Sequence, residues 1–276
     1  MKPVALLPLL AAALCGSLSA QTPAAPAVKP LKVMLITGGC CHDYKAQTEI
    51  LKKGLEERIN VTVDQVHVDD GSTKPKLPIY GNPDYGKGYD LIIHDECAAD
   101  IKDPETVKGV LKPHQDGIPA VALHCAMHSY RVGEIQKPAK EGTQDALWFE
   151  FLGVQSFRHG AQKPIEIKFG KKHPATTGIK DWTTGNEELY NNAKVFDTAE
   201  ELAKGKQEGE KDSVVVWTNL YGKDKVRVFC TTIGHNNTTV QDPQYLDLVA
   251  KGVLWATDKM DSAGKPKAGY GRQKKE

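Results

Sequence analysis

Histidines stand directly after several apolar segments of the chain. His42, with Asp43 beside it, His124 and His235 each follow such a segment, and His94 ends another. Imidazoles with a pKa near neutral transfer protons or bind divalent metals, and a neighbouring carboxylate fixes their tautomer. No H-E-x-x-H or H-x-H spacing decides between these two chemistries. The pattern predicts a histidine site for acid–base or metal chemistry, provided the fold brings these segment ends together.

The first half of the chain has the pattern of a parallel sheet. Continuous apolar runs alternate with helical patterns that begin at Asp43 and at Asp103–Pro104. The expected strands are residues 31–37, 61–68, 89–94 and 118–123. Since the carboxyl ends of parallel strands line one crevice, the histidines should meet there. The predicted fold class is α/β, with a doubly wound, mostly parallel sheet and helices on both faces.

The second half is expected to add β-rich structure to the same sheet. A helix is expected at residues 146–152, and a closing helix should begin at Asp242–Pro243. The expected strands are residues 165–169, 213–218 and 226–232, the last two joined around Gly222. Because no linker-like stretch divides the two halves, we expect an antiparallel extension of the sheet and not a separate domain.

The two ends of the chain differ in composition from residues 31–258, which we expect to form a single domain. Residues 1–20 have a basic start and an apolar run too short to span a membrane, which predicts an export signal and a periplasmic or secreted protein. A lipid anchor at Cys15 is disfavoured because Leu14 stands where a small residue is needed. Residues 21–30 predict an Ala/Pro-rich linker, and residues 259–276 predict a basic, flexible tail.

The composition excludes several classes of partner. The 276 residues carry 36 Lys and Arg against 35 Asp and Glu, a formal charge of +1. Loss of Lys2 with the export signal would leave a neutral chain, which argues against a nucleic-acid partner. The Gly-rich nucleotide loops and the G-x-S-x-G serine elbow are absent from the sequence. Neither a nucleotide nor a serine nucleophile is therefore expected.

Apart from Cys15, the cysteines are odd in number. An export signal permits disulfides, but an odd count leaves at least one thiol free. A nucleophilic role for Cys125 is disfavoured because its neighbours lack the glycines of a sharp turn, and packing roles are expected for Cys97 and Cys230. The sequence leaves the pairing open among Cys40, Cys41, Cys97, Cys125 and Cys230.

Taken together, seven segments resemble the ThuA-like family, which is named for trehalose utilisation. They are LITGGCCHDY (35–44), GIPAVALHCA (117–126), the F-x-H that ends at His159, KHP (172–174), NEELY (186–190), VVWTNLYGKDKVRVFCTTIGH (215–235) and GVLWA (252–256). The resemblance implies a fold similar to class I glutamine amidotransferases and flavodoxin. His124 stands near the position expected for the amidotransferase nucleophile, so glutaminase chemistry is not expected. Asn186 replaces the Asp with which many relatives begin that motif.

The resemblance also implies a site and a substrate class. The implied catalytic residues are His42, Asp43, His124, Glu188 and His235, with His159 and Tyr190 beside them as substrate-binding residues. The implied partner is a small carbohydrate, either trehalose or a related disaccharide or glycoside, including 3-keto sugars. We expect a hydrolase or lyase, with one divalent metal such as zinc as the candidate cofactor at His42, His124 and His235. The alternative is a non-catalytic periplasmic sugar-binding protein that uses the same crevice.

Overall fold

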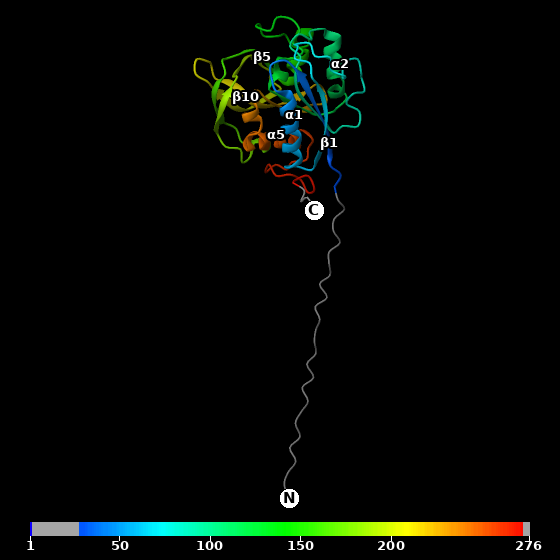
Figure 1. Cartoon of the computed structure of the whole chain (residues 1–276), viewed down its shortest axis with the longest axis vertical. Helices are drawn as coiled ribbons and strands as arrows, with labels where there is room; N and C mark the ends of the chain where they lie inside the picture. The colour runs from blue at the N-terminus through cyan, green and yellow to red at the C-terminus, as the bar shows by residue number, and fades with distance from the viewer. Residues whose placement is uncertain (2–27, 273–276) are drawn as a thin grey trace.

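The computed structural model describes Met1 and residues 28–272 (Figure 1). The predicted export signal lies outside these residues except for Met1, and so does the predicted linker except for residues 28–30. Within the described part of the chain, no helix has the length and apolar character needed to cross a membrane.

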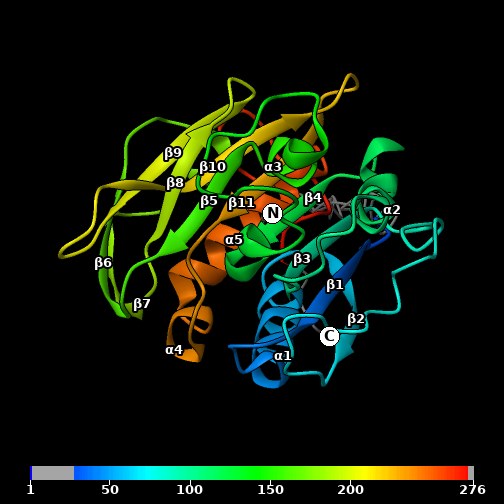
Figure 2. The same ribbon diagram turned by 90° about the horizontal axis from the view of Figure 1, so that it is seen from above.

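A nine-stranded sheet runs through the molecule in the order β2-β1-β3-β4-β11-β10-β9-β6-β7 (Figure 2). Its first part comprises β1 (Leu31–Gly39), β2 (Val61–Val68), β3 (Leu91–Cys97), β4 (Ala120–Leu123) and β11 (Val226–Thr231). Neighbouring strands from β2 to β11 are all parallel. The apolar runs of the first half therefore form the parallel core that their pattern predicts, and its carboxyl ends share one edge.

The rest of the large sheet is antiparallel. It comprises β10 (Ser213–Tyr221), β9 (Ala199–Lys206), β6 (Lys163–Phe169) and β7 (Trp182–Glu187). β10 and β11 form the expected hairpin around Gly222, and the pairs from β11 to β7 are all antiparallel. The expected antiparallel extension is confirmed, and the complete sheet is mixed, with parallel pairing confined to the part from β2 to β11.

A separate two-stranded sheet consists of β5 (Val154–His159) and β8 (Tyr190–Val195). The sequence pattern did not predict these strands, because several of their residues are polar. In their antiparallel register His159 lies opposite Tyr190. This pairing brings two segments of the site region together.

Helices cover both faces of the large sheet. Val33 and Leu35 of β1 belong to the core shared with α1 (Tyr44–Glu56) and α5 (Pro243–Ala256). The alternate residues, Met34 and Ile36, belong to the core shared with α2 (Pro104–Gln115) and α3 (Leu147–Leu152). This alternation across a strand explains why the runs are apolar throughout. The remaining helices are α4 (Asn237–Val240) and the short 3-10 helices η1 (His124–His128), η2 (Gln144–Ala146) and η3 (Pro174–Thr176).

The helix starts lie where the sequence predicts them. The side chains of Asp43, Asp103 and Asp242 accept backbone N–H groups at the first turns of α1, α2 and α5. A carboxylate at this position satisfies N–H groups that have no partner within the helix.

The predicted basic tail packs against the body over its described residues. Met260 is buried and bridges to Pro266, and the backbone at Gly271 bridges to Ile59. Asn60 Nδ2 donates to the Gly269 carbonyl at 2.8 Å. The prediction of a free tail is therefore wrong for residues 259–272. Its basic composition hid the backbone bonds that hold it.

Candidate active site

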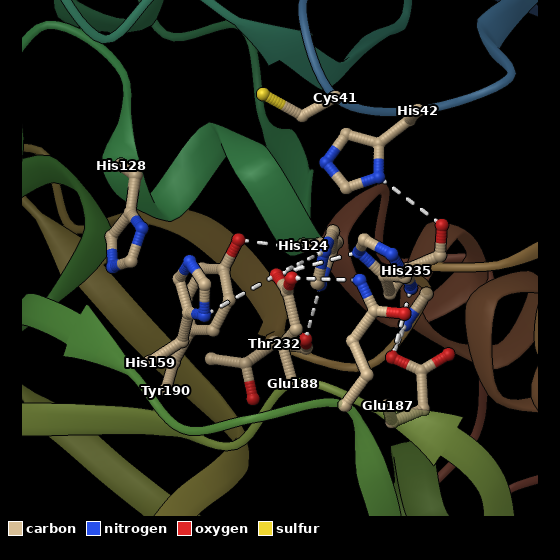
Figure 3. A network of polar contacts seen from close by, with 12 residues as sticks. Cys41, His42, His124, His128, His159, Glu187, Glu188, Tyr190, Thr232 and His235 are labelled. Atoms are coloured by element: carbon tan, nitrogen blue, oxygen red, sulfur yellow. Dashed lines mark hydrogen bonds and ion pairs between the residues drawn. The ribbon is translucent and has the colours of Figure 1, made fainter.

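Loops after β1, β4 and β11 bring three histidines to one place (Figure 3). Ring centroids of His42 and His124 are 4.7 Å apart, and those of His42 and His235 are 4.8 Å apart. The centroids of His124 and His235 are separated by 5.5 Å. These are the histidines that follow the carboxyl ends of the parallel strands, where a crevice was expected.

Unusual backbone conformations direct the loops to this place. Gly39 has φ of 99°, and a Cβ on it would lie 2.1 Å from the Cys97 carbonyl oxygen. Only glycine fits so close to β3 in that conformation. His124 itself has φ of 36°, in the left-handed region that non-glycine residues rarely adopt. Such local strain often marks a functional position, and here it lies at the end of β4.

Backbone carbonyls fix the orientation of two of the rings. His42 Nδ1 lies 3.1 Å from the carbonyl oxygen of His235, and His124 Nδ1 lies 2.7 Å from that of Thr232. Because a carbonyl only accepts, each Nδ1 carries the hydrogen, and the Nε2 of a neutral ring keeps its lone pair. Both rings thus offer Nε2 as a base or as a metal ligand.

Burial keeps these two rings neutral. It lowers the pKa of His42 to about 3, helped by the neighbouring charge of a protonated His124. Burial likewise lowers the pKa of His124 to about 4, against the opposing effects of the Thr232 carbonyl and Glu188. Near neutral pH both rings are therefore uncharged, with free lone pairs.

Glu188 supplies the negative charge of the site. Its Oε2 atom lies 3.3 Å from His235 Nδ1 and 3.7 Å from both His124 Nε2 and His159 Nδ1. Burial alone would raise the pKa of Glu188, but contacts with these three imidazoles outweigh it and hold the pKa at about 2. Contact with Glu188 in turn raises the pKa of His235. The carboxylate is thus ionised among the rings.

Glu187 holds the loop that carries His235. This fully buried carboxylate accepts the backbone N–H of His235 at 2.9 Å and those of Gly234 and Asn236 at 3.4 Å. Burial raises the pKa of Glu187, while the same hydrogen bonds oppose that rise. From the sequence, only Glu188 of this acidic pair was expected to have a role. Adjacent residues at the end of a strand point to different sides, so the second carboxylate was a detectable candidate.

An aromatic stack borders the site beside His124. The Tyr190 hydroxyl lies 3.4 Å from His124 Nε2. The His128 ring stacks on Tyr190 at 4.0 Å between centroids, and the His159 ring stacks at 5.6 Å. The side chain of His159 is 43% exposed and so stands at the mouth of the site. His128 was not predicted from the sequence, although it lies four residues after His124 in the same short helix.

Asp43 lies at the rim. Its carboxylate accepts from Ala46 N at 3.2 Å and from Asn237 Nδ2 at 2.8 Å. These bonds, chiefly the one from Asn237, lower its pKa. A hollow of about 530 Å³ opens beside it, lined by Cys41, His42, Asp43, Asn186, His235, Asn236, Asn237 and Thr238. Within this structure Asp43 caps α1 and shapes the entrance.

His94 does not join the site, so this prediction is wrong. β3 continues three residues beyond it to Cys97, which leaves His94 inside the sheet and fully buried. His94 Nδ1 lies 2.8 Å from Glu96 Oε1, and its Nε2 lies 3.0 Å from His114 Nε2. It belongs to a second polar network, packed against Trp148 and Phe151 of α3.

The cysteines divide into one disulfide and three thiols within the described residues. Cys40 and Cys41 are bonded to each other, and Cys97, Cys125 and Cys230 are free and buried. A hydrogen bond with Cys97, reinforced by burial, raises the pKa of Cys125 well above its ordinary value. A thiol with a raised pKa is a poor nucleophile, which agrees with the low expectation for Cys125.

Comparisons with known proteins agree on a family and a fold. The family model described as ThuA, trehalose utilisation, matches residues 32–256. Among solved structures, a ThuA-like protein from Parabacteroides merdae superposes with a TM-score of 0.61 at 20% identity, covering 89% of this chain and 98% of that one.

A second solved structure is that of a protein from Thermoplasma acidophilum assigned to GMP synthase. It superposes with a TM-score of 0.51 at 12% identity, covering 84% of this chain and 96% of that one. At these identities the likeness establishes the fold, which is that of glutamine amidotransferase-like proteins. A search of curated proteins finds no significant match.

Proposed function

The chain belongs to the ThuA family, described as trehalose utilisation, and from this premise we propose that it is a carbohydrate-processing enzyme of the hydrolase or lyase type. Its substrate class is trehalose or a related disaccharide or glycoside, including 3-keto sugars. The observation that carries this proposal is the convergence of His42, His124 and His235 around the ionised Glu188.

The same three histidines are proposed to bind one divalent metal such as zinc. One nitrogen from each ring can be chosen so that all three lie within 4.8 Å of one another. Two of the rings are held by backbone carbonyls, as metal-binding imidazoles usually are. His235 Nδ1 and Thr232 Oγ1 are buried with no hydrogen-bond partner among the described residues. Three histidines with an open position suit a catalytic metal.

The metal would supply a Lewis acid that polarises a sugar carbonyl or hydroxyl. The residues of the chain do the rest. Glu188, ionised and 3.3 Å from His235 Nδ1, is positioned to accept a proton from a substrate carbon or a water. His235, whose pKa is raised by that contact, can return a proton to the leaving oxygen.

A 3-keto sugar fits this division of labour. The hydrogen on the carbon beside the keto group is acidic, so a base removes it and the electron pair moves into an enolate. The enolate then expels the glycosidic oxygen, which leaves with a proton from an acid such as His235. Water added to the new double bond completes a hydrolysis, and its absence leaves a lyase product.

Export is proposed with this activity. The composition of residues 1–20 supports it, and so does the Cys40–Cys41 disulfide, because disulfides persist mainly in oxidising compartments.

Turnover of a 3-keto-disaccharide, followed by mass spectrometry, tests the proposal. We expect His124→Ala and His235→Ala to lose at least about a hundredfold in kcat/KM, as typical losses of acid–base or metal catalysis are. His173→Ala, which changes a histidine next to η3 and outside the site, is the matched control. Saturable binding of unmodified disaccharide with no product over long incubation would favour the sugar-binding alternative instead.

A further inference from the structure

Sulfur atoms gather beside the histidine site, at the ends of β1 and β3. Cys40 and Cys41 follow β1 directly and form a disulfide, and Cys97 ends β3 as a free, buried thiol. Sγ of Cys97 lies 3.6 Å from Sγ of Cys40, and all three sulfurs lie within 4.8 Å of one another. The disulfide therefore has a third sulfur in contact with it.

We propose that Cys40, Cys41 and Cys97 form a thiol–disulfide exchange site that presents Cys41 as a reactive thiol to small thiols and disulfides. The Cys97 thiolate attacks Sγ of Cys40, so that the Cys97–Cys40 bond forms as the Cys40–Cys41 bond breaks. The electron pair of the broken bond leaves with Cys41, which takes up a proton to replace the one Cys97 lost. Cys97 is oxidised and Cys41 is reduced, so the exchange needs no external oxidant.

The surroundings of Cys97 favour the attack. A hydrogen bond from the Cys125 thiol lowers the pKa of Cys97, and the charge of Arg131 adds to this effect, while burial opposes it. Thiolate is the attacking species in such exchange. The 3.6 Å contact selects Cys40 as the sulfur attacked, which makes Cys41 the leaving group.

The position of Cys41 makes the product accessible. Cys41 is exposed, whereas Cys40 is half-buried and Cys97 is buried. It precedes His42 and lines the same hollow as His42 and His235, as Figure 3 shows for its side chain. Once released, its thiolate can attack a small disulfide, forming a mixed disulfide at Cys41 and releasing one thiol. The modification would stand at the entrance of the histidine site.

Bond mapping of the intact protein tests this proposal without any assay of activity. The non-reduced protein is incubated with N-ethylmaleimide at neutral pH, denatured, digested at low pH and mapped by mass spectrometry. We expect two forms, one with Cys40–Cys41 and one with Cys40–Cys97 and a labelled Cys41. In Cys97→Ser the labelled Cys41 should fall by at least about tenfold, since the attacking sulfur is gone. Cys230→Ser, which removes a buried thiol that donates to the Leu152 carbonyl, should match the wild type.

A second variant tests the same geometry from the other side. Cys41→Ser incubated with oxidised glutathione should first form an adduct on Cys40, which Cys97 then displaces to give Cys40–Cys97. An adduct that persists on Cys40, together with a wild type whose Cys41 never takes the label, would overturn the proposal. Recovery of both Cys40 and Cys41 as free thiols from the oxidised protein would overturn it as well. Since the readout is a disulfide map, failure here leaves the proposed sugar chemistry untouched.

Discussion

The Nδ1–H of His42 donates to the backbone carbonyl of His235 at 3.1 Å, across a separation of 193 residues. Gln47 Nε2 donates to the same carbonyl at 3.0 Å. One peptide group thus sets the orientation of the His42 ring and is itself held by α1. The loops after β1 and β11 are therefore locked together by the residues that are proposed to do the chemistry.

Replacement of Glu188 by Gln should separate chemistry from metal binding. Gln keeps the size of the side chain but removes the negative charge 3.3 Å from His235. We expect kcat on a 3-keto-disaccharide to fall by roughly 10²–10⁴-fold, as losses of a positioned base do, with the bound metal retained. Steady-state kinetics and elemental analysis of the same sample check this. Glu134→Gln, on an exposed side chain, is the control, and an unchanged kcat in Glu188→Gln would remove Glu188 from the mechanism.

Glu187 should act through position alone. Its carboxylate accepts three backbone N–H groups of the His235 loop, and Gln offers only one oxygen to them. We expect Glu187→Gln to weaken metal affinity by about 10–100-fold, as changes behind a ligand typically do. Competition with a chelator of known affinity measures this. Glu208→Gln changes an exposed carboxylate and should bind metal like the wild type; equal affinities in the two variants would contradict the positioning role.

Gly39→Ala should destabilise the fold at the edge that carries the site. The added Cβ would lie 2.1 Å from the Cys97 carbonyl oxygen, on a backbone with φ of 99°. We expect a loss of roughly 2–4 kcal/mol in the free energy of unfolding, from strain and steric overlap together. Urea denaturation measures the loss. Gly71→Ala meets no atom within 4 Å and should cost little, so similar losses in both variants would argue against a constraint specific to Gly39.

His114 should make stability depend on acidity. Burial lowers the pKa of this histidine from 6.5 to about 3, helped by His94. The unfolded chain therefore binds a proton at a higher pH than the folded chain does, so stability is complete above pH 6.5 and declines as the pH falls toward 3. Between pH 6.5 and 5 this group alone contributes a loss of at most about 2 kcal/mol.

His114→Asn isolates that contribution, because the other buried histidines remain. Urea denaturation at pH 7 and at pH 5 should show a smaller difference between the two pH values in the variant than in the wild type. An equal difference in both proteins would show that His114 is not the group responsible.

The strand-end logic explains what the sequence could predict. Apolar runs such as residues 31–37 identify the parallel core, and a parallel core brings the residues after its strands to one edge. His42, His124 and His235 could therefore be grouped before the structure was known. His94 failed the same test because the true end of β3 is Cys97, and a polar run His–Asp–Glu gives no sign that a strand continues.

Other features depend on tertiary contacts that leave little trace in the sequence. β9, with the sequence AEELAKGK, has too few apolar residues to be recognised as a strand, since it is one-sided and pairs between β10 and β6. Glu187 has a fully buried carboxylate, which no local pattern indicates. The packed segment 259–272 is held by backbone bonds that its basic composition conceals.

Metal content of the purified protein tests the central claim most directly. Protein prepared without chelator, or reloaded with zinc and desalted, is measured by elemental analysis beside His42→Ala, His124→Ala, His235→Ala and the control His173→Ala. We expect one equivalent of divalent metal in the wild type and the control, and a loss of most of it in each of the other three variants. A wild type that takes up no metal after reloading, or site variants that retain a full equivalent, would contradict the proposed metal site.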